Sequence, residues 1–435
     1  MSRIPAPGPN EPDLFNKRPS SVLRVAVIGG GAGGFFAAVN IAEKNPNARV
    51  TIYEAASTPL RKVLISGGGR CNLTHACFDP ARLVDFYPRG ARELRSLFSK
   101  FQPRDTMAWF ERRGLALKTE PDGRVFPVSN SSQSVVDVLL TEAQKHGVQL
   151  RTGVRVSHIE RLEATNGFTI ITDDNKREDY DICLLSTGYS APGWKLAADL
   201  GHPVSAPAPS LFPFTVKSPV IEGLQGISLN HAAGQLSRPE EGGGKVGPRE
   251  EGALLITHTG LSGPLIYRLS ARSARELSEM RYQARIRLDL LPGLSDDALR
   301  EKLMQLWKTE DARKKIENTR LEPLSQRLWL SLLEAAGLDL EQRAETVSLK
   351  DLGRLIERLK RLDLPITGKS PSKEEFVSCG GVSRKSVDFK TMQSRLVPNL
   401  YFAGEILDID GLTGGFNFQA CWSAAWVISE ALKSP

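Results

Sequence analysis

The sequence predicts an α/β protein whose main domain is discontinuous along the chain. Three observations lead to this prediction. An apolar strand, a glycine-rich turn and the start of a helix follow one another between Val25 and Phe36. Strand and glycine character returns at Leu400–Gly404, close to the other end of the chain. Between these regions the composition changes to proline-rich and then leucine-rich segments, so an insertion separates the two parts of the domain.

The N-terminal turn carries the spacing of a dinucleotide-binding motif. Gly29, Gly31 and Gly34 follow the pattern Gly-x-Gly-x-x-Gly, which serves a tight turn, close approach of a pyrophosphate and close packing of helix on strand. A second strand ends in Glu54, about 20 residues after the last glycine, where a carboxylate binds a ribose hydroxyl. A glycine-rich turn without a ligand is the alternative. We expect a Rossmann-like nucleotide-binding domain.

Length and composition limit the possible classes of protein. The chain has 435 residues, which is too long for one core and predicts two or three domains. Its formal net charge of +7 permits a polyanionic partner without requiring one. Five scattered cysteines fit reduced thiols in the cytoplasm, and no apolar run reaches the ~18 residues that a membrane helix needs. Residues 1–22 are rich in proline and charge, so we expect a flexible tail and not a signal peptide.

The first part of the chain alternates strands and helices. Leu23–Glu54 is the first β-α-β unit. The glycine-rich stretch Arg61–Thr74 has no alternation of its own, so we expect a loop that contacts a ligand. The further elements expected before the insertion are a helix and three strands, namely Ser134–His146, Val154–Ile159, Phe168–Thr172 and Tyr180–Ser186.

The inserted region has a β part followed by a helical part. The β part begins with a strand-like segment at Pro192–Pro219, continues through a loop at Arg238–Glu251 and contains a strand that enters a tight turn at Ala253–Pro264. Ser295–Leu362 has leucines at spacings of three and four, so we expect helices there. A helix over Phe416–Leu432 closes the chain.

A second glycine cluster precedes that last helix. Gly404 and Glu405 follow a strand, and Gly411, Gly414 and Gly415 come directly before the helix. Helix starts of this kind bind anions or carbonyl groups. A ligand that needs both glycine clusters is long, which favours FAD over NAD. Helix packing and turns are the alternative explanation for these glycines.

Three stretches of the sequence resemble the BaiN/RdsA family of NAD(P)/FAD-dependent flavoproteins: Arg61–Thr74, Ile256–Pro264 and Thr391–Gln419. The resemblance covers nearly all of the chain from Leu23 onward. It implies a glutathione-reductase-like FAD domain that is interrupted by a small β-barrel-like domain, which itself carries a helical domain. The implied boundaries are 23–194 and 380–435 for the FAD domain, 195–291 and 363–379 for the barrel, and 292–362 for the helices.

The resemblance also implies a cofactor site made by both ends of the chain. The N-terminal glycines would contact the FAD pyrophosphate, Glu54 the adenosine ribose and Val156 the adenine. The residues implied to bind FAD are Gly29, Gly31, Gly34, Glu54, Arg61, Lys62, Gly67, Gly68, Gly69, Arg70, Cys71, Asn72, Val156, Thr187, Gly188, Gly404, Glu405, Gly414, Gly415 and Asn417. The loop after Gly188 is shortened to Tyr189–Trp194, and Ala424–Ala425 replaces a glycine-bearing stretch, so contacts of that loop over the cofactor are not carried across.

Reduction of a double bond needs a hydride from the flavin and a proton from a general acid. Cys71 is the candidate acid because it lies in the flavin-side loop, and its neighbour Arg70 is expected to lower its pKa. The alternative is that Cys71 packs beside the cofactor. His75 and His258 are other possible acids, each with a structural alternative. No residues have metal-ligand spacing, so we expect no metal site.

Basic residues are in excess between Arg89 and Lys118, which suits contacts with phosphate groups. Aromatic residues that would suit base stacking lie in and beside this segment: Phe86, Tyr87, Phe98, Phe101, Trp109 and Phe110. In the helical insertion, where basic and acidic residues are mixed, a solvated helix face explains the charge at least as well.

The resemblance connects these features to a reaction. The family includes enzymes that reduce a uridine of large-subunit ribosomal RNA and proteins linked to reduction of conjugated double bonds in bile acid intermediates. We therefore expect a cytoplasmic FAD oxidoreductase that uses NAD(P)H to reduce an activated carbon–carbon double bond, with a ribosomal RNA uridine as the preferred substrate. A small-molecule enone reductase or oxidase and a non-catalytic RNA-binding flavoprotein are the alternatives.

Overall fold

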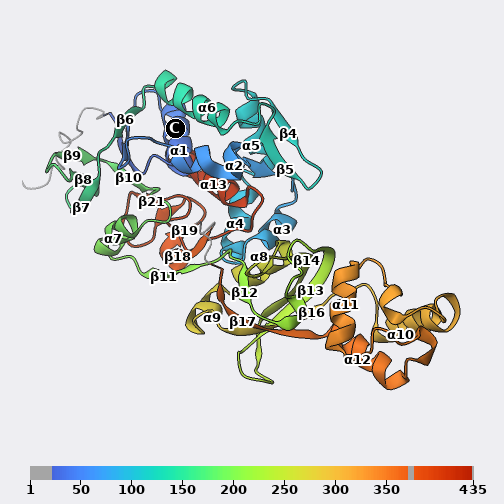
Figure 1. Ribbon diagram of the computed structural model, residues 1–435. Coiled ribbons are helices and arrows are strands. Elements are labelled where there is room, and N and C mark those ends of the chain that lie inside the picture. The colour runs from blue at the N-terminus through green and yellow to red at the C-terminus, as the bar shows by residue number, and fades with distance from the viewer. Residues whose placement is uncertain (1–21, 371–376, 434–435) are drawn as a thin grey trace, which may run out of the picture.

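Two lobes make up the chain, joined by a pair of strands (Figure 1). The structure is a computed structural model that describes residues 22–370 and 377–433. The tail expected at residues 1–22 therefore lies outside the described residues, apart from Val22.

A seven-stranded sheet forms the centre of the first lobe. Five strands are parallel, in the order β21-β10-β1-β2-β6, and β20 and β19 extend the sheet beside β21 in antiparallel fashion. In β1, Val25 pairs with Ile182 of β10 and with Val50 of β2. Parallel strands buried on both faces have near-continuous apolar sequences, which explains the lack of alternation in β1 and β10. The strands are β1 (Arg24–Ile28), β2 (Arg49–Glu54), β6 (Gln149–Thr152), β10 (Ile182–Leu185), β19 (Val387–Asp388), β20 (Gln393–Ser394) and β21 (Leu400–Phe402).

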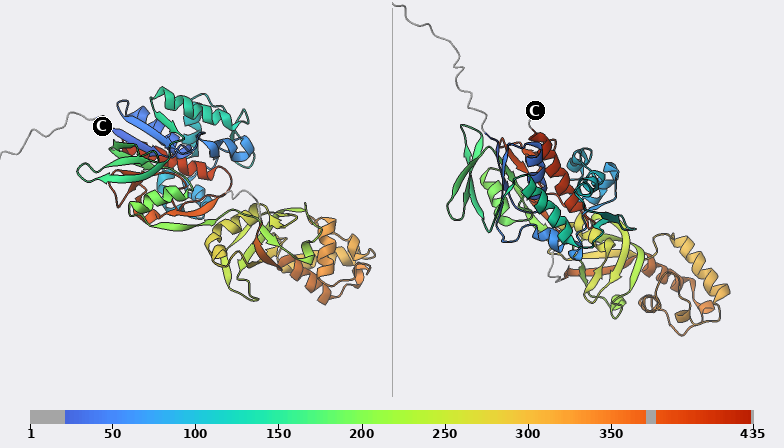
Figure 2. Two further views of the ribbon diagram at one scale, coloured as in Figure 1. Left: turned by 60° about the vertical axis from the view of Figure 1, so that its left-hand side comes forward. Right: turned by 90° about the horizontal axis from the view of Figure 1, so that it is seen from above.

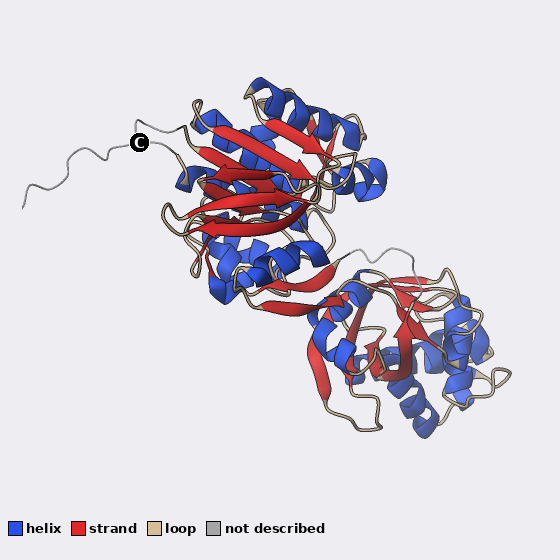
Figure 3. Ribbon diagram, turned by 90° about the vertical axis from the view of Figure 1, so that its left-hand side faces the viewer, coloured by secondary structure: helices blue, strands red, loops and turns tan. Residues whose placement is uncertain are grey.

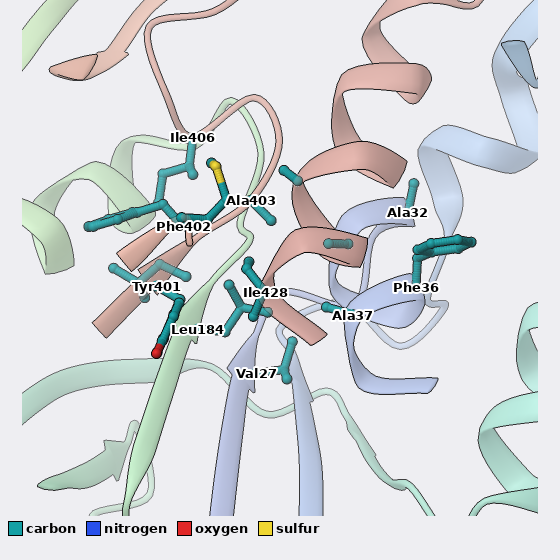
Figure 4. Packing of buried hydrophobic residues seen from close by; sticks show 14 of the residues in the cluster. Val27, Ala32, Phe36, Ala37, Leu184, Tyr401, Phe402, Ala403, Ile406 and Ile428 are labelled. Atoms are coloured by element: carbon teal, nitrogen blue, oxygen red, sulfur yellow. The ribbon is translucent and has the colours of Figure 1, made fainter. Parts of the chain in front are cut away.

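Helices α1 (Ala32–Lys44) and α13 (Phe416–Ala431), from opposite ends of the chain, pack against each other and against this sheet. In Figure 4, Ala37 of α1 and Ile428 of α13 lie above Val27 and Leu184 of the strands. An antiparallel meander of β7 (Val156–Leu162), β8 (Gly167–Thr172) and β9 (Arg177–Tyr180) contacts β1 and β10. The two parts of the predicted main domain therefore share one core.

The residues between β2 and β6 form helices and a small sheet. They are α2 (Arg61–Gly69), α3 (Pro80–Leu83), α4 (Ala91–Phe98), α5 (Pro103–Glu111), α6 (Ser132–Lys145), β3 (Thr74–His75), β4 (Leu117–Thr119) and β5 (Arg124–Pro127). The prediction of a loop over Arg61–Thr74 is wrong for its first part. Arg61–Ile65 is helical, and the backbone leaves the helical conformation at Ser66.

The second lobe contains a closed six-stranded barrel, β12-β15-β14-β13-β16-β17. Figure 3 shows its strands in red, separated from the main sheet by the pair of β11 (Val204–Pro209) and β18 (Ser378–Val382). The barrel elements are β12 (Phe214–Val216), β13 (Ser228–Ser237), β14 (Lys245–Ile256), β15 (Gly260–Ser262), β16 (Ala284–Asp289) and β17 (Leu362–Lys369), with helices α8 (Pro264–Arg272) and α9 (Ala274–Glu279).

Three α-helices are inserted between β16 and β17, at the end of the molecule far from the main sheet (Figure 2). Each begins after a serine whose hydroxyl accepts a hydrogen bond from a backbone amide of the first turn, as N-cap serines do. Their leucines share one hydrophobic cluster with the barrel. The helices are α10 (Asp296–Gln305), α11 (Gln326–Ala335) and α12 (Leu349–Lys360).

The predicted discontinuous α/β fold with an inserted barrel and helices is confirmed, with two local corrections. The strand-like interpretation of Pro192–Pro219 is wrong at its start, because Ala191–Asp199 is helix α7. Ser190 caps this helix, and Pro192 lies in its first turn, where a missing N–H costs nothing. The loop expected over Arg238–Glu251 is wrong from Lys245 onward, where β14 begins and pairs with β13.

Candidate cofactor site

Three neighbouring parallel strands of the main sheet have their carboxyl ends on the same side of the sheet. A glycine with positive φ follows each strand. Gly29 follows β1 with φ +112°, Gly188 follows β10 with φ +64°, and Gly404 follows β21 with φ +79°. Ligands of open α/β sheets bind outside the carboxyl ends of the strands. The topology thus brings together three glycines that are distant in the sequence.

The glycines of the N-terminal turn have different roles. A Cβ atom on Gly29 would lie 2.4 Å from the Ser186 carbonyl oxygen, and one on Gly34 would lie 2.0 Å from the Gly29 oxygen. These two positions need glycine for the fold itself. Gly31 is different, because no described atom lies within 4 Å of its hypothetical Cβ and its φ of −90° suits any residue. The open space at Gly31 lies at the start of α1, where helix amides face an anion.

Glu54 lies beside this turn. Its Oε2 accepts a hydrogen bond from the Gly30 amide (2.7 Å), and its Oε1 accepts one from the Ala56 amide (2.8 Å). The backbone of Val154 donates to the Glu54 carbonyl (3.0 Å), so β7, which begins at Val156, starts close to the Glu54 backbone. The predicted ribose and adenine residues therefore lie near each other at one end of the site.

A tight backbone turn continues the site at the end of α2, where the backbone is no longer helical. Gly67, Gly68 and Gly69 have φ values of +57°, +67° and +82°, and no described atom lies near a Cβ placed on Gly68 or Gly69. Three successive residues in the left-handed region favour glycine. The Cys71 backbone is also left-handed, with φ +56°.

The predicted pKa of Cys71 is wrong in direction. Its side chain is 0% exposed, and burial raises the pKa of the thiol to about 12. Arg70 does not lower it, because its guanidinium pairs with Glu120 and lies 4.0 Å from the centre of the Phe126 ring. The thiol is therefore protonated at neutral pH. The catalytic roles of Cys71 and Arg70 stay predictions.

The C-terminal glycine cluster meets the N-terminal stretch directly. The Asn72 amide lies between the Thr74 carbonyl oxygen (3.0 Å) and the Gly415 amide nitrogen (3.1 Å). A Cβ on Gly415 would come within 2.7 Å of the Thr74 backbone. Asn417 exchanges two hydrogen bonds with the Gly411 backbone, at 2.7 and 3.1 Å, and so closes the loop that contains Gly414.

An ion pair joins the two halves of the site near Gly188. Lys62 Nζ lies 2.9 Å from Glu405 Oε2, and both atoms lie within 4 Å of a Cβ placed on Gly188. The neighbouring Thr187 hydroxyl is buried and has no hydrogen-bond partner in the described part of the chain. This hydroxyl faces Gly193 of α7, where a Cβ atom would lie 1.8 Å from it, so it packs against the helix and does not face an open site.

A buried polar network that the sequence interpretation missed supports the last helix. Gln419 Oε1 accepts hydrogen bonds from Thr74 Oγ1 (2.6 Å) and Thr106 Oγ1 (2.9 Å), while its amide nitrogen donates to Ser423 (3.0 Å). These contacts fix the start of α13 against β3. The sequence feature that could have indicated this network is a glutamine inside an otherwise apolar helix.

The aromatic part of the predicted RNA footprint is wrong. Tyr87, Phe98, Phe101, Trp109 and Phe110 are each at most 3% exposed and belong to the core. The sixth residue, Phe86, is part-exposed and its ring stacks on Phe416 (4.3 Å), so the stacking surface expected from all six does not exist.

The basic part of that footprint is smaller than the sequence suggested. Arg89 pairs with the buried Asp410, and Arg113 pairs with Glu43 and Glu142. The arginines of α4 and α5 that are exposed and form no ion pair with a described residue are Arg92, Arg95 and Arg104.

The sheet topology, with glycines at the carboxyl ends of three neighbouring parallel strands, is that of a nucleotide-binding domain. The open space at Gly31 and the meeting of Thr74 with Gly415 suit a ligand longer than one mononucleotide. The chain belongs to the family described as "HI0933-like protein Rossmann domain", whose model matches residues 23–431. This confirms the predicted family of FAD-dependent flavoproteins and the oxidoreductase class.

Curated relatives match nearly the whole chain. A ribosomal RNA dihydrouridine synthase of Escherichia coli is 28% identical over 411 residues, which cover 93% of this chain and 97% of that protein. A 3-dehydro-bile acid delta(4,6)-reductase of Clostridium scindens is 29% identical over 417 residues, covering 94% and 98%. A ribosomal RNA dihydrouridine synthase of Haemophilus influenzae is 26% identical, covering 94% and 98%.

Solved structures with a similar course of the chain are more distant. A 3-ketosteroid-delta4-(5alpha)-dehydrogenase from Rhodococcus jostii has 12% identity and a TM-score of 0.49, with 96% of this chain and 98% of that chain covered. A flavocytochrome c3 fumarate reductase has 13% identity and a TM-score of 0.44, covering 96% and 79%. No helix in residues 22–370 and 377–433 is long and apolar enough to cross a membrane.

Proposed function

We propose that this protein uses FAD and NAD(P)H to reduce a carbon–carbon double bond conjugated to a carbonyl, in a uridine of large-subunit ribosomal RNA. The observation that carries the proposal is the full-length match to two ribosomal RNA dihydrouridine synthases. The third relative is named as a reductase of a bile acid, and its name also describes saturation of a double bond. The shared reaction supports the chemistry, and the two RNA-modifying relatives support the substrate and a cytoplasmic location.

The residues of the site divide between the two ends of such a cofactor. Gly31 and Glu54 would hold the adenosine diphosphate half, with Val156 beside the adenine. Gly188, Lys62 and Glu405 would lie along the middle, and Gly67–Asn72, Gly414, Gly415 and Asn417 at the flavin end. When bound, FAD supplies the hydride chemistry, and the protein supplies position and a proton.

The proton donor has two candidates next to the flavin end. Cys71 carries its proton at neutral pH but is fully buried. His75 is part-exposed, its ring stacks on Phe416 at 4.8 Å, and its Nδ1 has no partner among the described residues. Burial lowers the pKa of His75, so the ring is neutral at pH 7. We propose that Cys71, with Arg70 holding the loop through Glu120, donates the proton, and His75 is the alternative.

An RNA substrate needs a surface beside this end of the site. Phe78, three residues after His75, is 38% exposed, and the Arg104 guanidinium lies 5.1 Å from the centre of its ring. An exposed aromatic ring beside an arginine suits stacking of an unpaired base. Arg92 and Arg95 of α4 add exposed positive charge nearby in the sequence. We propose that these four side chains contact the RNA.

The decisive experiment maps dihydrouridine in ribosomal RNA from a strain that lacks this gene. We expect one uridine of the large subunit to lose its modification and to regain it when the gene is restored. Expression of the triple variant Arg92→Ala/Arg95→Ala/Arg104→Ala in this strain should restore the modification only in part. The matched control is Arg49→Ala, which replaces an exposed arginine at the amino end of strand β2. An unchanged modification map contradicts the RNA substrate.

The bile acid reductase supports the alternative, a small-molecule enone reductase. In that case the map stays unchanged, and a conjugated ketone reoxidises the NAD(P)H-reduced flavin. A flavoprotein that binds RNA without turnover would keep its flavin oxidised with both NADH and NADPH.

A further inference from the structure

Two buried aspartates lie in the segment between Gly404 and Gly411. Asp410 is 1% exposed and Asp408 is 8% exposed. Both carboxylate oxygens of Asp410 accept hydrogen bonds from the Arg89 guanidinium, whose side chain is only 11% exposed. Asp408 Oδ1 lies 2.8 Å from the guanidinium of Arg275. Each carboxylate is therefore neutralised by an arginine from a distant part of the sequence.

Ser210 adds a third partner to the first pair. Its hydroxyl donates to Asp410 and accepts a hydrogen bond from Arg89 (2.9 Å), and its side chain is fully buried. Ser210 is the residue directly after β11, where the chain leaves the main lobe for the barrel. Its own backbone amide donates to Val377, just before β18. The segment that connects the two lobes after β11 is thus hydrogen-bonded, through Ser210, to Asp410 and Arg89.

Asp408 is tied to strand β18 and to helix α9 of the inserted lobe. Its carboxylate accepts a hydrogen bond from the Gly380 amide of β18 (3.1 Å), and its own amide donates to Val382 (3.0 Å). Arg275 belongs to α9, which follows the barrel helix α8 and contacts β11. A side chain of the inserted lobe thus reaches the segment that leads into the cofactor site.

Asp410 is close in the chain to the residues that we propose at the flavin end. Asp410 precedes Gly411, whose amide and carbonyl are both held by Asn417. Asn417, Gly414 and Gly415 are the residues proposed at the edge of the flavin. A shift of the Asp410 backbone would move these groups together, because a two-point arginine–carboxylate contact allows one geometry only.

We infer that Arg89, Ser210 and Arg275 are positioning residues that set the place of the segment 408–417 relative to the inserted barrel. They act on the cofactor only through Asp408 and Asp410. Two ion pairs and the Ser210 hydroxyl therefore fix the position of the proposed flavin-binding residues relative to the inserted lobe. This inference rests on the proposed placement of the flavin at Gly414, Gly415 and Asn417.

The test measures FAD affinity and the visible spectrum of bound flavin in the full-length protein. Asp410→Asn leaves the Arg89 charge without its partner, so it also threatens folding. The double variant Arg89→Met/Asp410→Leu removes both charges and avoids a buried unpaired ion. Arg275→Gln removes the partly exposed partner of Asp408. Arg287→Gln, an exposed arginine of β16 without an ion pair to a described residue, is the control.

We expect the double variant to bind FAD at least about tenfold more weakly than wild type, with a changed flavin absorption band and midpoint potential, at temperatures where the protein is folded. Arg275→Gln should shift the band and the potential in the same direction by less, and the control should shift neither. If both variants fold and keep the wild-type affinity, band and potential, the network is merely structural and the inference is overturned. Failure of the wild-type protein itself to bind FAD would contradict the proposed cofactor site instead.

Discussion

Replacement of Gly31 by alanine should separate cofactor binding from folding. A methyl group at Gly31 meets no described atom within 4 Å, and the backbone there (φ −90°, ψ −171°) suits alanine. The variant should fold, with an unfolding free energy within about 1 kcal/mol of wild type, because the lower entropy of its unfolded chain offsets the poorer N-cap that alanine makes for α1. The same methyl group occupies the space in front of α1 that we assign to the pyrophosphate.

The expected cost to FAD follows from the size of that methyl group. Forcing an extra carbon into a closely packed contact costs about 1–3 kcal/mol, which corresponds to a dissociation constant raised about 5- to 150-fold. Thermal unfolding of the cofactor-free protein measures the first effect, and titration of FAD followed by its fluorescence measures the second. Both are compared with wild type in the same buffer.

Gly34→Ala is the matched control, because it makes the opposite prediction. Its Cβ would lie 2.0 Å from the Gly29 carbonyl oxygen, a backbone atom that moves only if β1 and α1 separate. We expect a loss of stability of about 1–3 kcal/mol or more. Wild-type FAD affinity in Gly31→Ala, with a melting temperature close to that of wild type, would refute the assignment of the pyrophosphate to this turn.

Three further predictions concern single side chains. Cys71→Ser should keep FAD binding and flavin reduction by NAD(P)H but slow product formation if the thiol donates the proton; native rates of both steps would remove Cys71 from the mechanism. Lys62→Met breaks a part-exposed ion pair with Glu405, so we expect less than about 1 kcal/mol change in unfolding free energy but weaker FAD binding, measured by urea denaturation and titration. Burial lowers the pKa of His202, which bonds Ser394 at 2.7 Å, so the unfolded state binds the proton more readily and stability should fall as the pH drops below about 6.5. In His202→Gln that fall, followed by thermal unfolding from pH 7.5 to 5, should be smaller.

The parts of the fold that follow from local sequence were predictable. The strand at Val25, the turn at Gly29 and the hairpin at Asn166 depend on residues close together in the chain, and Asn166 adopts the left-handed conformation that the turn requires (φ +54°). The barrel depended on the family resemblance, because β14 begins with Lys245–Glu251, whose polar sequence lacks a buried face. Its partner β13 supplies the pairing, which no local pattern reveals.

Electrostatic partners were the least predictable feature. Arg70 is adjacent to Cys71 in the sequence, yet its charge is taken by Glu120, which is 50 residues away. Arg89 was counted as part of a basic surface, and it is buried against Asp410. Burial and long-range pairing decide the effect of a charge, and both depend on tertiary contacts that sequence spacing does not contain.

The point of insertion explains why the cofactor is easier to identify than the substrate. Three glycines assigned to FAD follow strands β1, β10 and β21, which are neighbours in one sheet although the insertion separates the last from the other two. Parallel pairing places the carboxyl ends of these strands on the same side of the sheet. The glycines there come together regardless of what the inserted lobe contains. The inserted lobe is under no such constraint, and it touches the cofactor segment through Ser210 and Arg275. The glycines of the sheet therefore indicate the cofactor, whereas two relatives that match nearly the whole chain carry names with different substrates, ribosomal RNA and a bile acid.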